Sequence, residues 1–216
     1  MKIAILGGTG EQGPGLALRW AKAGEDVIIG SRQKEKGQRV ARELNEELGR
    51  DLIKGTDNAE AADGADVVVL TVPYSAHVST LESVRSHLQG KVFVDVSVPL
   101  DADNPRRVAM PAAGSAAEEA QEILGDSVKV VGALQNVSAT LLRDLGAKLD
   151  CDVLVCGKDK AARETVTRLV ERLGMRAVDA GPLETARIIE PLTALLIRLN
   201  IRHKVHSAGI RITGLP

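Results

Sequence analysis

The chain has 216 residues, and its 28 basic and 29 acidic side chains give a net charge of −1 at pH 7. This length corresponds to one domain, or to one domain with a small extension. A nearly neutral chain is not a bulk electrostatic binder of nucleic acid or membranes, and with only Trp20, Tyr74 and Phe93 as aromatic residues it offers no stacking platform for bases.

The cysteines and the apolar runs indicate the compartment. Cys151 and Cys156 are five residues apart on a predicted strand, so their side chains point to opposite faces and no disulfide is expected. Two thiols alone cannot form a four-ligand zinc site. No stretch reaches the roughly 18 apolar residues that a membrane span requires, and the amino terminus lacks a signal-peptide core. We therefore expect a cytoplasmic protein with no metal and with neither nucleic acid nor membrane as a partner.

Short apolar runs alternate with amphipathic segments along the first 135 residues. The runs predict strands, and the segments between them predict helices because their apolar residues recur every three or four positions. In chain order we expect strand 2–6, helix 14–23, strand 26–29, helix 34–48, strand 52–54, helix 58–63, strand 66–72, helix 75–88, strand 91–98, helix 112–124 and strand 128–134.

The alternation predicts the fold class. Strands that are apolar at every position are buried on both faces, as in a parallel sheet covered by helices. After residue 136 the alternation is less regular, with strands at 152–156 and 176–179 and helices at 160–173 and 186–203. Pro191 should kink the last helix or mark its first turn. We expect a Rossmann-type doubly wound parallel sheet over residues 1–135 and a smaller α/β carboxyl-terminal domain over 136–216.

A glycine-rich turn joins the first predicted strand to the first predicted helix. Gly8, Gly10 and Gly13 match the spacing G-x-G-x-x-G in that context. In such a turn the first glycine permits the tight bend, the second lets the backbone approach a pyrophosphate, and the third lets helix and strand touch. The amino end of the helix adds free N–H groups for the phosphates. The pattern predicts dinucleotide binding.

The end of the second predicted strand selects the nucleotide. An NAD-binding unit normally places an acidic residue there for the ribose 2′-hydroxyl, but this chain has Ser31 and Arg32, followed by Lys34 and Lys36. A guanidinium can bind a 2′-phosphate through two hydrogen bonds. The sequence therefore favours NADP, although Lys34 could simply be a solvated lysine.

The ligand of an open α/β sheet lies across the carboxyl ends of its strands. Here those ends are Thr71-Val72-Pro73, Ser97-Val98-Pro99 and Leu134–Ala139. We expect the ribose and the nicotinamide to run past them. Both prolines also terminate strands, and the two roles are compatible.

No pattern for proton transfer or nucleophilic catalysis stands out. The chain contains no G-x-S-x-G, no H-E-x-x-H and no acidic metal cluster. His77 and His87 fall on an apparently exposed helix, so we expect both to be solvated. For Tyr74 a stacking or wall role beside the nicotinamide is favoured over acid catalysis, because position 78 is valine and not a lysine that could assist it. His203 and His206 could touch an anion or lie at the surface. The sequence thus predicts no catalytic side chain, which suits a hydride transfer between two redox cofactors.

The carboxyl-terminal segment is basic. Residues 187–216 carry a net charge of +4, whereas the rest of the chain carries −5. A basic segment on an acidic body suggests an anionic second ligand. The alternative is a basic helix end that interacts favourably with its own dipole.

Taken together, the motifs resemble the F420:NADP oxidoreductases, also called NADPH-dependent F420 reductases. The similarity spans essentially the whole chain and includes the glycine turn, Lys36, Leu70–Pro73 and Cys156–Asp159. It is most specific in Gly30-Ser31-Arg32 and in Asp179–Leu183. The resemblance implies three sets of contacts: Thr9, Gly10, Glu11 and Gln12 with the pyrophosphate, Ser31, Arg32 and Lys36 with the 2′-phosphate, and Val72, Val98 and Ala139 with the nicotinamide end.

The resemblance also implies an activity and an assembly. A member of this family would be a homodimer that transfers a hydride between NADP(H) and the deazaflavin coenzyme F420, whose ring lies against the nicotinamide. Some members have a histidine where this chain has Leu134-Gln135-Asn136. Two alternatives are an imine or keto-acid reductase of the pyrroline-carboxylate reductase type, for which the tail is short, and a non-catalytic NADP-sensing module.

Overall fold

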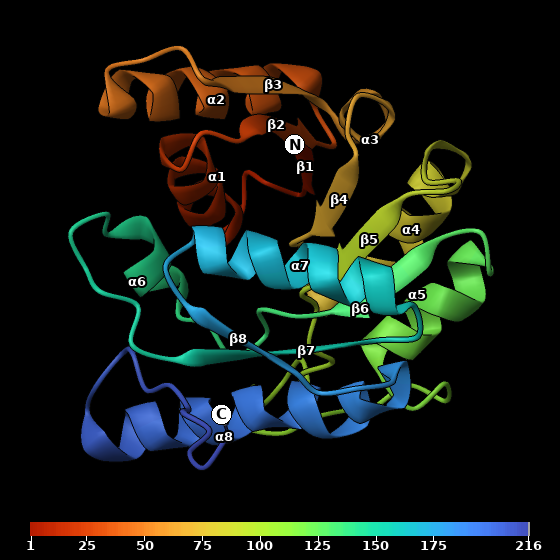
Figure 1. The fold of residues 1–216 in the computed structure, drawn as a ribbon, viewed down its shortest axis with the longest axis vertical. Helices are drawn as coiled ribbons and strands as arrows, with labels where there is room; N and C mark the ends of the chain where they lie inside the picture. The colour runs from red at the N-terminus through yellow and green to blue at the C-terminus, as the bar shows by residue number, and fades with distance from the viewer. Residues whose placement is uncertain (216) are drawn as a thin grey trace.

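The computed structural model describes residues 1–215. A single sheet of eight strands has the order β3-β2-β1-β4-β5-β6-β7-β8 and runs through the centre of the molecule (Figure 1). The strands are β1 (Lys2–Leu6), β2 (Asp26–Ser31), β3 (Ile53–Asp57), β4 (Val67–Leu70), β5 (Val92–Asp95), β6 (Lys129–Gly132), β7 (Asp152–Gly157) and β8 (Arg176–Asp179).

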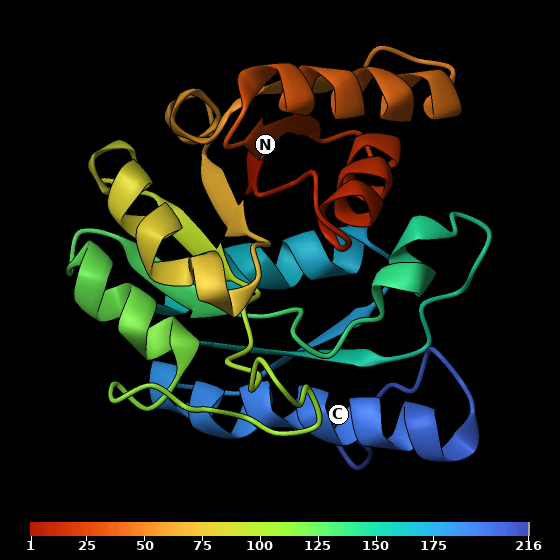
Figure 2. The same ribbon diagram turned by 180° about the vertical axis from the view of Figure 1, so that it is seen from behind.

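Helices cover both faces of the sheet. In Figures 1 and 2, α1, α2 and α7 lie on one side, and α3, α4 and α5 lie on the other. The helices are α1 (Gly13–Lys22), α2 (Lys34–Leu48), α3 (Asn58–Asp63), α4 (His77–Val84), α5 (Ala116–Leu124), α6 (Ala139–Arg143), α7 (Lys160–Arg172) and α8 (Ala186–His203), with 3-10 turns at Tyr74–Ala76, Arg85–His87 and Leu183–Thr185.

The buried core has two layers, one on each face of the sheet. Successive strand residues alternate between the layers, so Ile3 and Ile5 belong to one cluster and Ala4 and Leu6 to the other. Burial of both faces explains why the strands are apolar throughout. The two cysteines follow the same rule, because Cys151 and Cys156 are buried, free and in opposite clusters.

The predicted doubly wound α/β fold is confirmed, with one difference in strand direction. Strands β1 to β6 are parallel, whereas β7 runs antiparallel to β6 and parallel to β8. The connection from β6 to β7 therefore does not cross back over the sheet. It stays at the carboxyl edge of β6 and contains the short helix α6, which the sequence did not indicate. Because both extra strands join the same sheet, the division at residues 135/136 stays a prediction.

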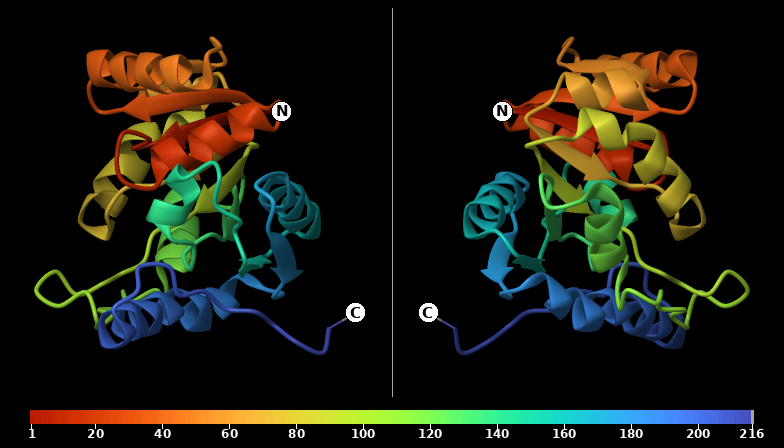
Figure 3. Two further views of the ribbon diagram at one scale, coloured as in Figure 1. Left: turned by 90° about the vertical axis from the view of Figure 1, so that its left-hand side faces the viewer. Right: turned by 90° about the vertical axis from the view of Figure 1, so that its right-hand side faces the viewer.

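The last helix encloses one end of the molecule. Helix α8 lies at the end of the molecule farthest from β2 and β3 (Figures 1 and 3). Its limits match the prediction, and Pro191 lies inside the helix rather than in its first turn. Within residues 1–215, no helix combines the length and apolar character needed to cross a bilayer.

Candidate functional site

A cavity of about 590 Å³ opens at the carboxyl ends of β1, β2 and β4. Seven of the predicted site residues line it: Thr9, Gly10, Ser31, Arg32, Lys36, Val72 and Pro73. Another cavity, of about 860 Å³, follows edge strand β3 and includes the amino ends of β1 and β2 at Lys2 and Asp26. The smaller cavity matches the position at which parallel α/β sheets bind ligands.

The three glycines of the G-x-G-x-x-G motif differ in what an added side chain would meet. A Cβ at Gly8 would lie 2.7 Å from the Ile5 carbonyl oxygen, and one at Gly13 would lie 2.5 Å from Gly8 Cα. These two glycines therefore serve close packing. A Cβ at Gly10 would meet only the Gly7 oxygen, at 3.4 Å, and the Thr71 oxygen, at 3.8 Å. The fold itself tolerates a side chain at position 10, so the space above Gly10 fits the predicted role of a pyrophosphate cradle.

The basic corner of the cavity lies at the end of β2. Ser31 is buried, and its Oγ accepts a hydrogen bond of 3.3 Å from the Gln33 N–H. Arg32 and Lys36 are exposed and line the cavity. Lys34 lies outside this lining and pairs with Glu60 at 2.6 Å. Ser31, Arg32 and Lys36 can therefore bind a phosphate, because no acidic residue at the end of β2 competes for them.

Outside the lining of this cavity, the carboxyl ends of the neighbouring strands β5 and β6, which we call the inner end of the site, hold polar atoms without protein partners. Within residues 1–215, Ser97 Oγ, Gln135 Oε1 and Asn136 Oδ1 are buried and make no hydrogen bond. Leaving a buried polar group unpaired costs about 1–3 kcal/mol. Three such atoms leave unused hydrogen-bonding capacity at the ends of β5 and β6, on the same edge of the sheet as the cavity.

Backbone strain occurs at the same place. Leu134 has φ 72° although it is not glycine, and residues held in this conformation concentrate at functional sites. Its carbonyl oxygen accepts a 3.1 Å hydrogen bond from Gln12 Nε2. Gln12 therefore connects the glycine turn to the strained loop after β6, instead of lining the cavity.

The other predicted residues lie around the cavity rather than in its lining. Gly8 is buried beneath the turn, and Glu11 is exposed. Val98 is half-buried after β5, and Ala139 is half-buried as the first residue of α6. Their contact with a nicotinamide stays a prediction.

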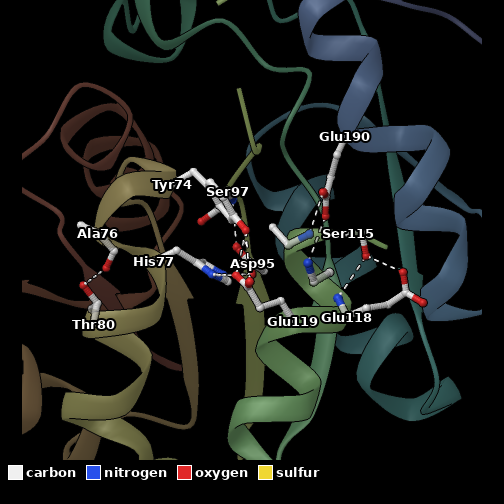
Figure 4. A network of polar contacts seen from close by, with 12 residues as sticks. Tyr74, Ala76, His77, Thr80, Asp95, Ser97, Ser115, Glu118, Glu119 and Glu190 are labelled. Carbon is white, nitrogen blue, oxygen red and sulfur yellow. Dashed lines mark hydrogen bonds and ion pairs between the residues drawn. The ribbon is translucent and has the colours of Figure 1, made fainter. Parts of the chain in front are cut away.

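The expectation that His77 is solvated is wrong. His77 is 0% exposed, with Nε2 2.7 Å from Asp95 Oδ2 and Nδ1 2.9 Å from Glu119 Oε2 (Figure 4). The reason is that α4 is amphipathic and begins at this residue, which turns it against β5 and α5. Tyr74 does not stand free beside the cavity either, because its hydroxyl donates to Glu119 at 3.0 Å.

Burial and neighbouring groups shift the pKa values of His77, Tyr74 and Glu190. Burial lowers the pKa of His77, but Asp95 and Glu119 outweigh it, so the pKa lies above its ordinary value of 6.5. Burial, followed by the Glu119 hydrogen bond, raises the pKa of Tyr74. Burial also raises the pKa of Glu190 to about 8, against the Ala116 and Ala117 N–H groups, which lower it.

Sequence reasoning missed several residues of the site. Asn58 lines the cavity and accepts a 3.2 Å hydrogen bond from the Gly7 N–H, and Gln33, Ala76 and Thr80 also line it. Asn58 begins a helix directly after a strand end, which is the position where a parallel sheet brings side chains to its ligand. That signal was present in the sequence.

Comparisons with known proteins agree with this geometry. Residues 2–99 match the family model described as NADP oxidoreductase coenzyme F420-dependent. The chain is 48% identical to the F420-dependent NADP reductase of Methanothermobacter marburgensis over the whole of both chains. It is also 48% identical to the enzyme of the same name from Methanocaldococcus jannaschii, over 100% of this chain and 99% of that one.

A solved structure shares the fold over nearly the whole length. It comes from Arthrobacter sp. FB24 and has been proposed to be an F420-dependent NADP reductase. It superposes with a TM-score of 0.86 at 29% identity and covers 99% of this chain and 100% of that one.

Proposed function

This chain belongs to the family of F420-dependent NADP reductases, and on that premise we propose that it transfers a hydride directly between NADP(H) and coenzyme F420. As a member of the family it is an oxidoreductase that uses these two molecules. The observation that carries the proposal is one cavity that combines a phosphate cradle with a basic corner, at the same edge of the sheet as three unpaired polar atoms after β5 and β6.

The cavity residues can bind the successive parts of NADP along the carboxyl edge of the sheet. The backbone around Gly10 would bind the pyrophosphate at the amino end of α1. Arg32 and Lys36 would bind the 2′-phosphate, with Ser31 donating a further hydrogen bond. Val72 and Pro73 would contact the part of the nucleotide that leads to the nicotinamide.

The inner end would hold the two reacting rings. When bound, nicotinamide and deazaflavin supply the chemistry, an exchange of a hydride between ring carbons. Ser97, Gln135 and Asn136 would hydrogen-bond the polar edges of the rings, which satisfies their free atoms. Val98 and Ala139 would limit how far the rings separate. In this mechanism no side chain gives or takes a proton during the hydride transfer, and orientation supplies most of the rate advantage.

We propose that the active form is a homodimer assembled through α8. Ile188 and Leu195 are 69% and 49% exposed, and the half-buried Leu192 and Leu199 complete an apolar stripe at helical spacing. An exposed apolar stripe marks an interaction site, and a second copy is the partner that the family resemblance implies. We also propose a cytoplasmic location, which the two free, buried cysteines support.

One assay tests the proposed reaction against its alternatives. Purified protein is mixed with NADPH and one acceptor at a time, which is oxidised F420, a cyclic imine or a keto acid. We expect the visible absorbance of F420 to disappear and the other acceptors to leave NADPH unchanged. Consumption of NADPH with the imine alone would favour a reductase of the pyrroline-carboxylate type. Tight NADPH binding without turnover of any acceptor would favour a sensing module.

A further inference from the structure

The buried cluster around His77 joins the elements that surround the inner end of the site. His77 begins α4, Asp95 ends β5, and Glu119 lies on α5 (Figure 4). Tyr74 adds a hydroxyl that donates to Glu119, and its ring centre is 5.4 Å from that of His77. Four side chains thus link segments that are up to 45 residues apart.

Asp95 connects His77 to the loop after β5. Its Oδ2 faces His77, while its Oδ1 accepts a 2.8 Å hydrogen bond from the Ser97 N–H. Its carbonyl oxygen accepts a 3.1 Å bond from Gln135 Nε2. Ser97 and Gln135 are two of the three residues with unpaired buried atoms, and Asp95 orients Ser97 through its carboxylate and Gln135 through its backbone carbonyl.

The other side of His77 reaches the loop after β4. Tyr74 directly follows Pro73, which lines the cavity. The Ala76 N–H donates to the Pro73 oxygen at 2.8 Å, and Ala76 also lines the cavity. The position of His77 therefore fixes the spacing between this loop and the loop that carries Ser97 and Val98.

We propose that His77 is a positioning residue for hydride transfer, whose imidazolium, held between Asp95 and Glu119, sets the spacing of the loops Val72–Pro73 and Ser97–Val98. The inference rests on the proposed function. Both ring nitrogens face carboxylate oxygens, and only the imidazolium donates from both nitrogens at once. Loss of its proton removes one of these hydrogen bonds and leaves two carboxylates facing each other across the ring.

The groups that face the ring define the expected pH dependence. They are Asp95 from β5, Glu119 from α5 and Tyr74 from the turn before α4, and Glu190 from α8 adds a charge interaction. The acidic neighbours hold the proton on His77. We expect kcat to fall at a pH above the ordinary range of histidine, with little change in the KM for NADPH, because the phosphates bind at the other end of the cavity.

The test compares His77→Gln with His87→Gln, a matched control on a half-exposed histidine that faces Asp63. We expect His77→Gln to lower kcat at least tenfold and to change NADPH affinity less than threefold, since misplaced reactants lose orientation rather than phosphate contacts. In the free protein, hydrogen exchange of the Ser97 amide should become faster in His77→Gln only. The double variant His77→Gln/Asp95→Asn, whose two amides can pair without charge, should remove the alkaline fall in kcat.

Three results would overturn the inference. They are an unchanged kcat in His77→Gln, unchanged protection of the Ser97 amide, and an alkaline limb that persists in the double variant. If His77→Gln does not fold, Glu119→Gln on the more exposed side of the ring replaces it: kcat should fall, exchange of the Ser97 amide should become faster, and the alkaline fall in kcat should move to lower pH because one carboxylate that holds the His77 proton is gone. Failure of the proposed function appears separately, as no F420 turnover by the unchanged protein, whereas the exchange measurement needs no F420.

Discussion

The choice between NADPH and NADH depends on Arg32, an exposed residue at the end of β2. Replacing it with alanine should weaken NADPH binding by roughly 10- to 150-fold, since a hydrogen bond to a charged group contributes about 1.5–3 kcal/mol. NADH has no 2′-phosphate and should bind almost as before. Titrating both nucleotides into the variant measures the difference. An equal loss for both would mean that Arg32 maintains the loop rather than the phosphate.

Alanine substitutions at Gly10 and Gly13 should separate an effect on ligand binding from an effect on folding. Gly10→Ala places its Cβ in ordinary contact with the Gly7 oxygen, whereas Gly13→Ala forces a Cβ to within 2.5 Å of Gly8 Cα. We expect Gly10→Ala to keep the melting temperature and to weaken NADPH binding by about tenfold, or 1.4 kcal/mol. Gly13→Ala should lower the melting temperature of the free protein. A large thermal loss in Gly10→Ala would contradict the cradle.

At the scale of elements, the junction of α8 with α5 carries a titratable group. Glu190 is fully buried, and its carboxylate accepts hydrogen bonds of 2.8 and 3.0 Å from the Ala116 and Ala117 N–H groups at the start of α5. Its native pKa of about 8 lies above the ordinary 4.5. Between these values the folded state holds a proton that the unfolded state has released, so the free energy of unfolding falls as pH rises.

Glu190→Gln tests this assignment. The amide does not titrate, so the fall in unfolding free energy between about pH 5 and 8 should become shallower. His77 contributes a fall of the same sign above pH 6.5, because its native pKa is also raised, and this part should remain. Urea unfolding at several pH values gives the two slopes. Equal slopes in both proteins would show that Glu190 is charged throughout.

The elements were largely predictable because local pattern decides them. The helix Lys34–Leu48 and the strand Arg176–Asp179 match their predicted limits, since helical spacing and β-propensity act within each segment. The direction of β7 was not predictable, because it depends on where the chain lies after β6. The burial of His77 was missed for a similar reason: its two partners lie 18 and 42 residues away.

The site was predictable where the motif is local to the chain. The glycine turn and the end of β2 are read from adjacent residues, and the structure brings Thr9, Gly10, Ser31 and Arg32 around one cavity. The inner end was harder, because Ser97 and Gln135 come together only when β5 and β6 pair. Their roles toward a bound ring stay predictions.

At the scale of the whole molecule, the apolar stripe on α8 should determine assembly. Ile188→Glu would place a charge in the proposed interface, where charged residues are depleted, and we expect sedimentation to change from dimer to monomer. Ile28, by contrast, is half-buried and packs against the core of the same chain, so Ile28→Val is a control that should leave assembly unchanged. A monomeric unchanged protein would contradict the homodimer.

Two arginines of the basic carboxyl-terminal segment pair with acidic residues, whereas Arg198 lies beside other arginines. Arg187 pairs with Glu118 at 2.7 Å and Arg211 pairs with Asp150 at 3.3 Å. Arg198 instead lines a cavity of about 210 Å³ with Arg106 and Arg107, and none of the described residues of that lining is acidic. Five residues before Arg198, Thr193 donates to the Gln135 oxygen at 2.9 Å. Helix α8 therefore connects the loop after β6 to the arginine cluster.

This arrangement predicts a salt dependence. If the arginine cluster binds the anionic phosphate and glutamate tail of F420, the KM for F420 should rise with ionic strength, because exposed charges are screened over about 8–10 Å at moderate salt. Arg198→Ala should raise that KM at low salt and flatten its salt dependence, while Arg211→Ala, which removes a paired charge, should change neither. A KM that is flat from low to high salt in the unchanged protein would assign the basic segment to the dimer contact or to solvent.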